Sequence, residues 1–291
     1  MQIQRVYLNK IMHRCRNEIE LLLNPLKFML KKIFLYSTFL MVMGCATVPI
    51  TGRRQLSLVP AAEMQQMSYA SYKQVLDTAQ VINNSQSTAM VKRVGGRIQR
   101  AVEQYMAQNN LSDQLAGYAW EFNLIQDKQV NAWCMPGGKV VVYTGLIPVA
   151  RDETGLAVVM GHEIAHAIAK HGDERMSQGL LQQLGGATLQ AALGSNPGLT
   201  NNLFLTAYGA GSQLGMLAYG RKQESEADEL GLIFMAMAGY DPQQAISFWE
   251  RMASGKNGQA PPEFLSTHPS DATRIADIQR HMPEALKYYK K

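Results

Sequence analysis

The segment 158–172 reads Val-Val-Met-Gly-His-Glu-Ile-Ala-His-Ala-Ile-Ala-Lys-His-Gly, with three histidines in a mostly apolar stretch. His162 and His166 are four residues apart, so a helix places both on one face. Two imidazoles on one face can bind a single ion, and histidine is a favoured zinc ligand. Glu163 then lies beside the ion, where it can take a proton from the attacking water. This His-Glu-x-x-His pattern predicts a catalytic zinc site; a chance spacing on an amphipathic helix is the alternative.

A catalytic zinc site also needs a third protein ligand and an open position. Two acids downstream, Glu224 and Asp228, are four residues apart and share a helix face. Glu226 points away from Glu224 by roughly 160° at about 100° per residue. The spacing suits Glu224 as a ligand and Asp228 as the hydrogen-bond partner of a zinc-binding histidine. The alternative is a solvated helix start, where acids favour the positive end of the helix dipole.

Four motifs, in order over about residues 60–285, resemble those of the M48 family of zinc metallopeptidases. They are Asn-Ala-Trp-Cys-Met-Pro-Gly-Gly (131–138), His-Glu-Ile-Ala-His (162–166), Glu-Ser-Glu-Ala-Asp-Glu-Leu-Gly (224–231) and Ser-Thr-His-Pro-Ser-Asp-Ala-Thr-Arg-Ile (266–275). The resemblance implies that Glu224 is the third zinc ligand. It also implies that His268 stabilises the negative charge of the transition state. The chain resembles in particular the periplasmic lipoprotein branch of the family.

Hydrophobic periodicity predicts the elements that carry these residues. Helices are expected over 61–80 and 88–109, a strand over 118–127, and two short strands around a Pro-Gly-Gly turn over 130–147. Helix is expected from there to the end, with breaks near Gly172, 194–198, Gly239 and 255–262. Together with the resemblance, this predicts an α+β fold that is mainly helical. We expect a gluzincin-type zinc metallopeptidase domain with a small sheet beside the His-Glu-x-x-His helix.

Segment 174–219 is rich in Gly, Ala and Leu and could be mistaken for membrane helices. Glutamine and asparagine residues interrupt it, and no window of 18 residues is free of them, whereas a bilayer span needs about 20 apolar residues. We therefore expect a soluble helical hairpin that packs on the core. A mobile flap over the site and an integral membrane protease are the alternatives.

The N-terminal segment carries the charge imbalance of the chain. Residues 1–44 hold seven Lys or Arg and two Glu, which accounts for the formal net charge of +5, so the neutral remainder gives no indication of a nucleic-acid partner. Residues 29–45 contain two lysines, then an apolar run of eleven residues, then Gly-Cys. The apolar run is too short to span a bilayer, and the whole pattern indicates a signal peptide. Its end, Val-Met-Gly-Cys45, resembles a bacterial lipobox, which implies a lipid on Cys45. An uncleaved anchor or an ordinary signal peptide is the alternative.

These signals predict the domain organisation and the location. Residues 1–44 are expected to be an over-extended start, with Met29 as the true initiator, plus a lipoprotein signal peptide. Residues 45–60 are the lipidated N-terminus and linker, and 61–291 form the peptidase domain. The expected location is the bacterial cell envelope, lipid-anchored and facing the periplasm, with the outer membrane favoured over the inner.

Substrate binding is predicted on the hairpin of 130–147. Val140 and Val141 are expected to form an edge strand along the cleft, with Asn131 and Ala132 on the same hairpin. An extended peptide would add to that edge through backbone hydrogen bonds. An ordinary core strand is the alternative.

The sequence therefore predicts one zinc ion per chain and hydrolysis of unfolded or damaged cell-envelope proteins, with Glu163 as general base. Two other roles for His268 stay open: it fixes its own loop, or it is a fourth zinc ligand in a resting state. The rival function is a non-catalytic zinc lipoprotein that acts as a chaperone or assembly factor for outer-envelope partners.

Overall fold

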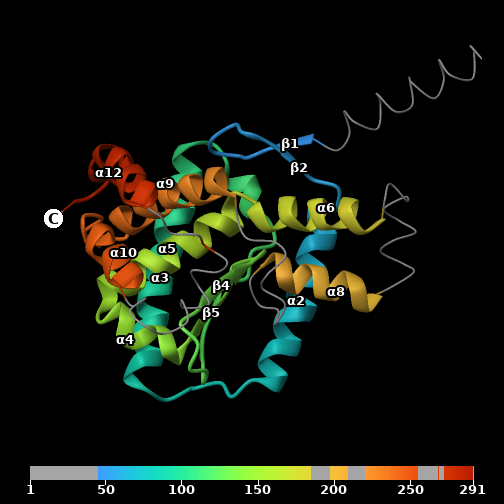
Figure 1. The fold of residues 1–291 in the computed structure, drawn as a ribbon, viewed down its shortest axis with the longest axis horizontal. Helices are drawn as coiled ribbons and strands as arrows, with labels where there is room; N and C mark the ends of the chain where they lie inside the picture. Colours follow the sequence, from blue (N-terminus) through green and yellow to red (C-terminus); the bar gives the residue numbers. More distant parts are fainter. Residues whose placement is uncertain (1–44, 185–196, 209–219, 255–267, 269–271, 291) are drawn as a thin grey trace, which may run out of the picture. The chain divides into compact units, whose positions relative to one another are not determined.

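Two buried helices, α5 (Glu153–Ile168) and α9 (Arg221–Met237), pack against each other in the computed structural model (Figure 1). It describes residues 45–184, 197–208, 220–254, 268 and 272–290. Helix α5 begins where the sequence provides a cap, because the Asp152 Oδ1 atom accepts a hydrogen bond from the Gly155 backbone N–H at 2.9 Å. Such a cap satisfies one of the free N–H groups of the first helical turn. The His-Glu-x-x-His motif lies in the second half of α5.

Two glycines allow α5 and α9 to approach each other closely. A Cβ atom at Gly231 would lie 2.9 Å from the backbone nitrogen of His162, and one at Gly161 would lie 3.0 Å from the Gly231 carbonyl oxygen. Both distances are shorter than ordinary van der Waals contacts, so a larger residue would push the helices apart. This close contact brings the acids of α9 next to the histidines of α5.

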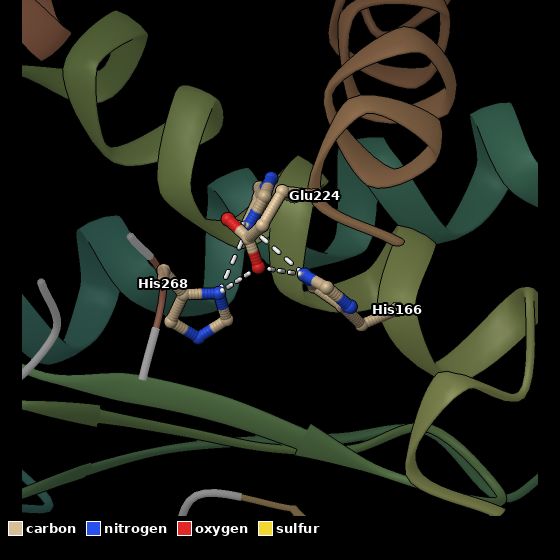
Figure 2. A group of neighbouring side chains, drawn as sticks. His166, Glu224 and His268 are labelled. Carbon is tan, nitrogen blue, oxygen red and sulfur yellow. Dashed lines mark hydrogen bonds and ion pairs between the residues drawn. The ribbon is translucent and has the colours of Figure 1, made fainter. Parts of the chain in front are cut away.

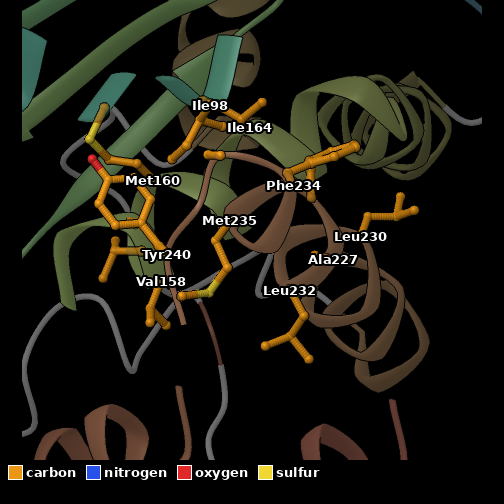
Figure 3. Close-up of a cluster of buried hydrophobic side chains, with 14 of the residues drawn as sticks. Ile98, Val158, Met160, Ile164, Ala227, Leu230, Leu232, Phe234, Met235 and Tyr240 are labelled. Carbon is orange, nitrogen blue, oxygen red and sulfur yellow. The ribbon is translucent and has the colours of Figure 1, made fainter. Parts of the chain in front are cut away.

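The core around this helix pair is apolar and continuous. Figure 3 shows Val158, Met160 and Ile164 of α5 near Phe234 and Met235 of α9. Ile98, from α3 (Gln86–Gln108), packs into the same cluster. Burial of large aliphatic and aromatic side chains stabilises the fold by about 1.5–3 kcal/mol each. The site therefore lies beside the larger apolar core of the described residues.

A three-stranded sheet covers another side of α5. Its strands are β3 (Glu121–Ile125), β4 (Ala132–Met135) and β5 (Lys139–Tyr143), in the order β3-β5-β4. Strand β5 pairs in parallel with β3 and antiparallel with β4, and Ala132 lies opposite Val142. Strand β4 packs on α5, which confirms the predicted sheet beside the motif helix.

The predicted edge position of Val140 and Val141 is wrong. Both residues lie in the central strand β5, which has a neighbour on each side, and both are fully buried. Central strands are buried on both faces and read as continuous apolar runs, and Val140–Val142 is such a run. Strand β4, with Ala132, has β5 as its only partner strand among the described residues.

The predicted linker of residues 45–60 contains a second, two-stranded sheet. Strands β1 (Cys45–Thr47) and β2 (Arg54–Leu56) pair with each other, and the turn between them is closed by a hydrogen bond from the Val48 N–H to the Arg53 carbonyl at 2.8 Å. Strand β2 contacts α6 (His171–Leu184). The segment therefore folds onto the peptidase domain, where the sequence had predicted only a connection.

The remaining helices surround these parts. They are α2 (Ala61–Thr78), η1 (Ser112–Leu115), η2 (Thr144–Leu146), α4 (Ile147–Ala150), α8 (Pro197–Ala207), α10 (Gln244–Ser254) and α12 (Ala272–Leu286). Helices α6 and α8 pack against each other as the predicted hairpin, while 185–196 and 209–219 lie outside the described residues. None of the helices described is long and apolar enough to cross a membrane.

Candidate metal centre

Four potential metal ligands converge from three places in the chain. His162 and His166 come from α5, Glu224 comes from the first turn of α9, and His268 precedes α12. Each offers one donor atom, and the four atoms lie within 4.8 Å of one another. All four side chains are buried. Figure 2 shows the imidazoles of His166 and His268 on two sides of the Glu224 carboxylate.

The spacing of these atoms suits one small cation. Two atoms that bind one zinc ion at about 2.0–2.1 Å and at tetrahedral angles lie roughly 3.3 Å apart. The Nε2 atoms of His162 and His166 are 3.0 Å apart, and His162 Nε2 is 3.2 Å from His268 Nδ1. Glu224 Oε1 is 3.3 Å from His166 Nε2 and 2.9 Å from His268 Nδ1. Three imidazole nitrogens and one carboxylate oxygen can therefore hold a metal ion.

Glu163 lies beside this group and outside it. Its Oε1 atom is 3.5 Å from His268 Nε2 and has no hydrogen-bond partner among the described residues. Burial raises the pKa of Glu163 to about 8. A buried carboxyl oxygen without a hydrogen bond is costly, which indicates that Glu163 has a role other than packing.

A carboxylate and a guanidinium hold His162 in place. The Nδ1 atom of His162 is 2.8 Å from Asp228 Oδ1, on the ring edge opposite the nitrogen that faces the metal position. Arg274 of α12 binds Asp228 with Nη2 at 2.7 Å and Nε at 2.8 Å, and its Nη1 lies 3.0 Å from Glu224 Oε2. The Arg274 guanidinium stacks over Trp249, 3.4 Å from the ring centroid. Asp228 therefore lies where the sequence predicted the partner of a metal-facing histidine.

A second histidine and a different carboxylate hold His166. The Nδ1 atoms of His166 and His171 are 2.8 Å apart, and His171 Nε2 is 2.9 Å from Glu226 Oε2. Burial lowers the pKa of His171, so its ring is neutral at pH 7. Burial alone would raise the pKa of Glu226, but hydrogen bonds from His171, Thr51 and Arg53 outweigh it and lower that pKa to about 2.

Sequence reasoning missed His171, Arg274 and the role of Glu226. His171 was visible as the third histidine of segment 158–172, but it lies beyond the end of α5 and off the helix face that carries His162 and His166. Glu226 does point away from Glu224, as the helix geometry predicted, and it faces His171 instead. Arg274 stands in the Thr-His-Pro motif, where only His268 had been considered.

The residues predicted to bind substrate lie in β4, in β5 and directly before β4. Val140 and Val141 are buried in the middle of the sheet. Asn131 is buried at the start of β4, and its Oδ1 accepts a hydrogen bond from the Ala132 backbone N–H at 2.9 Å. Cys45 begins β1, and its side chain lies outside those described, so its lipidation stays a prediction.

The sequence model of Peptidase family M48 matches residues 92–282, which contain α5, α9 and His268. The chain belongs to peptidase family M48. The predicted family and the mainly helical fold with a small sheet are thereby confirmed. M48 members are metal-dependent peptidases, which agrees with a cation site formed by the donors from α5 and α9.

Several proteins are similar to this M48 chain. Mitochondrial metalloendopeptidase OMA1 of Schizosaccharomyces pombe is 35% identical over 243 residues, which are 82% of this chain and 66% of that protein. Metalloendopeptidase OMA1, mitochondrial, of Homo sapiens is 29% identical over 280 residues, 94% of this chain and 51% of that protein. Beta-barrel assembly-enhancing protease of Escherichia coli (strain K12) is 28% identical over 240 residues, 80% and 46% respectively. The chain thus spans about half to two thirds of the length of these relatives.

The predicted location, lipid-anchored and facing the periplasm at a bacterial outer membrane, is wrong. The M48 relatives from Schizosaccharomyces pombe and Saccharomyces cerevisiae, at 35% and 34% identity, are named as mitochondrial enzymes. A basic segment followed by a short apolar run records only charge and hydropathy, and such a segment does not by itself identify the membrane. The segment in question, 1–44, lies outside the described residues.

Proposed function

We propose that this chain is a zinc-dependent endopeptidase that cleaves unfolded or extended polypeptides. The observation that carries the proposal is the convergence of four donor atoms with the buried carboxylate of Glu163 beside them. Membership of family M48 supports the same activity. So do the names of the relatives, which include metalloendopeptidases and a protease.

His162, His166 and Glu224 are the proposed ligands. Two imidazoles and one carboxylate form a donor set typical of catalytic zinc sites, in contrast to the cysteine-rich sets of most structural ones. Cys134, the one free cysteine among the side chains that the structure describes, is buried in β4. These residues would hold a zinc ion, which would supply Lewis-acid chemistry for a carbonyl and for the attacking water at neutral pH.

Glu163 is the proposed general base. It follows the ligand His162 directly, so the α5 backbone fixes it next to the metal ligands without making it one of them. A carboxylate in this position takes a proton from the attacking water and passes it to the leaving amine. Burial raises its pKa to about 8, whereas a neighbouring cation would lower that pKa again, toward the range in which a carboxylate accepts a proton at neutral pH.

His268 is the proposed donor to the negatively charged oxygen of the transition state. Its Nε2 atom faces Glu163, so the ring borders the place where water and the scissile bond must meet. Its Nδ1 atom also lies at ligand distance from the other donors, which supports the alternative of a fourth ligand in a resting state. Burial lowers the pKa of His268 to about 4, so the ring is neutral and can take either role.

The substrate is proposed to bind as an extended polypeptide near the end of β4. Residues Ala132–Met135 of that strand are buried, have β5 as their one partner strand among the described residues, and pack over α5. A cavity of about 280 Å³ lies where β4 ends, between Pro136 and Gly137 on one side and Ala167 of α5 on the other. Binding of an extended chain mainly through its backbone accepts many sequences, which suits unfolded polypeptides as substrates.

The rival function is a non-catalytic zinc protein that assists the assembly of other proteins. The observation that favours it is the fourth donor, His268, because structural zinc sites are closed by four protein ligands. The relative from Escherichia coli is named for enhancing β-barrel assembly, which supports a role of this kind as well. A closed structural site would have no use for Glu163, and for this reason we favour the peptidase.

The test is digestion of an unfolded protein by the purified chain before and after the metal is removed with a chelator. The proposal expects internal cleavage products by mass spectrometry, their loss after chelation, and their return when zinc is added back. If the zinc-loaded chain leaves the unfolded protein intact but suppresses its aggregation, the rival function is correct.

A further inference from the structure

We propose that Arg53, in the turn between β1 and β2, is a positioning residue for the metal site and acts on His166 through Glu226 and His171. The inference rests on the proposed metal site, since it assigns His166 its orientation as a ligand. It makes the N-terminal β1–β2 segment, which lies outside the family match at 92–282, a working part of the site.

The contacts form one continuous chain from the turn to the ligand. Arg53 Nε donates a hydrogen bond to Glu226 Oε2 at 2.7 Å. The same Oε2 atom is 2.9 Å from His171 Nε2, and His171 Nδ1 is 2.8 Å from His166 Nδ1. The hydroxyl of Thr51, in the same turn, donates to the other oxygen of Glu226. Both oxygens of the carboxylate are therefore engaged, and each contact is at hydrogen-bond distance.

The direction of the protons follows from which nitrogen of His166 faces the other donor atoms. The Nε2 atom of His166 faces His162 Nε2 and Glu224, so it must be free of a proton to bind a cation. The proton of the neutral ring then lies on Nδ1, which donates to Nδ1 of His171. His171 in turn carries its proton on Nε2 and donates it to Glu226. Glu226, which accepts this hydrogen bond at 2.9 Å, therefore orients His171 and through it the ring of His166.

Arg53 holds the Glu226 carboxylate in place. Glu226 is only 7% exposed, and a carboxylate at such a site needs a charged partner. Arg53 also binds Glu174 of α6, with Nη2 at 2.9 Å and Nη1 at 3.2 Å, while Gln223 Nε2 donates to the same carboxylate at 2.7 Å. The Arg53 guanidinium thus connects the turn to both α6 and α9. Helix α6 begins with His171, and α9 carries Glu226. A lysine cannot make this two-sided contact.

The local backbone explains why His171 can reach back to His166. Helix α5 ends at Ile168, and Lys170 has a positive φ of 59°. A residue in this left-handed conformation ends a helix and turns the chain. Helix α6 then starts at once with His171, whose ring stands against that of His166, with the centroids 4.9 Å apart.

The experiment measures zinc affinity of the full chain by competition with a chromophoric chelator, together with the visible spectrum of the cobalt-loaded protein. Neither readout needs activity. Removing the partners of metal ligands weakens metal binding by about 10- to 100-fold, and Arg53 acts two contacts further out, so we expect Arg53→Ala to weaken zinc binding by about tenfold. We expect the cobalt spectrum to change as well. Arg54→Ala is the matched control, because Arg54 is the exposed neighbour in the same segment.

A double variant separates positioning from a general loss of stability. If Arg53 acts through Glu226, Arg53→Ala should add less than about twofold to the loss of affinity in Glu226→Gln, because residues in one network are not additive. Arg53→Lys should recover part of the affinity, and it carries the test if Arg53→Ala does not fold. Wild-type zinc affinity in folded Arg53→Ala, or in folded Arg53→Lys when Arg53→Ala does not fold, would overturn the inference. So would fully additive losses in the double variant. If the wild-type chain itself binds no zinc, the proposed function fails instead.

Discussion

His162 and His166 stand one turn apart on α5, yet the nitrogens that face away from the metal position contact partners of different kinds. His162 meets the carboxylate of Asp228 directly, and Arg274 completes that pair from α12. His166 meets a second imidazole, His171, and only then the carboxylate of Glu226. The first arrangement is short and lies within the helical core, whereas the second is longer and ends in the N-terminal turn at Arg53.

The difference predicts that the two histidines depend on different parts of the chain. A carboxylate bound directly to an imidazole fixes its orientation and makes its other nitrogen a better ligand. A neutral imidazole between the ligand and the carboxylate still fixes the orientation of the ligand. It also puts the carboxylate farther away, which weakens the electrostatic effect of that charge on the ligand. We therefore expect the His162 side to contribute more to metal affinity than the His166 side, and the His166 side to depend on distant parts of the chain.

The largest expected effect is the loss of the metal when a ligand is removed. His162→Ala and Glu224→Ala should not retain zinc after dialysis, because two remaining ligands are too few for a stable site. Zinc content per chain, measured by atomic emission, checks this. Glu229→Ala is the matched control, since Glu229 lies on α9 with an exposed side chain. A full zinc content in Glu224→Ala would show that Glu224 is not a ligand. The comparison of the two sides of the site would then lose its basis.

The next largest expected effect is that of replacing His268. His268→Ala should lower kcat by roughly 10²- to 10³-fold, as loss of a donor to the developing oxyanion does. KM should move little and zinc content should stay near that of the wild type, the pattern of an interaction made in the transition state. Steady-state kinetics on a peptide substrate check this. A variant that loses zinc would instead support the fourth-ligand role, and an unchanged kcat would leave His268 without a catalytic part.

The expected difference in metal affinity between the His162 side and the His166 side is tested by Asp228→Asn and Glu226→Gln. Each replaces a carboxylate by its amide and keeps the shape. Loss of a partner of a metal ligand weakens metal binding by about 10- to 100-fold, and we expect Asp228→Asn near the upper end and Glu226→Gln near the lower end. Chelator competition for zinc measures both. Equal losses, or a larger loss in Glu226→Gln, would contradict the view that the direct contact is the stronger one.

Asp173→Asn is expected to have the smallest effect on metal affinity. It changes the stability of α6 and leaves His171 in place. Burial raises the pKa of Asp173 from its usual 3.8 to about 6, although the Tyr208 hydroxyl donates to it. The folded state thus holds this proton more tightly than the unfolded state does. The stabilisation of the fold by protonated Asp173 is therefore complete below pH 3.8 and is lost as the pH rises through 6. Asp173→Asn should therefore raise the free energy of unfolding at pH 7 by up to about 3 kcal/mol and leave it unchanged below pH 3.8.

Urea unfolding of wild type and Asp173→Asn at pH 7 and at pH 3.5 measures this. Zinc affinity at pH 7 should be the same in both, because the side chain of Asp173 binds the Tyr208 hydroxyl among the described residues, away from the contact between His166 and His171. A fall in zinc affinity would mean that the His166 side depends on the stability of α6 as a whole and not on the contacts through His171.

The parts of the site that could be predicted from the sequence are those fixed by local geometry. His162, His166 and Glu163 lie within one helix, and Glu224 and Asp228 lie within another, so helix periodicity alone relates the members of each set. The close contact between the two helices depends on Gly161 and Gly231, and its result, Asp228 against His162, was foreseen only as a possible pair.

The parts that could not be predicted depend on tertiary contacts. His171 follows a break in the helix at Lys170, and beyond such a break the 100° spacing no longer says which face a residue takes. Arg53 is more than 100 residues from Glu226 in the chain, and no local pattern links them. The edge position assigned to Val140 failed for a similar reason, because side-chain alternation does not tell which strand of a sheet is central.

In the proposed catalytic site, Glu163 acts as the base beside the donors of α5 and α9. Zinc content and peptide hydrolysis, measured together in purified Glu163→Gln, test this role. We expect about the same zinc content as in the wild type and a rate of hydrolysis that falls roughly 10²- to 10⁴-fold, as removal of a general base does. Wild-type hydrolysis by zinc-loaded Glu163→Gln would contradict this role.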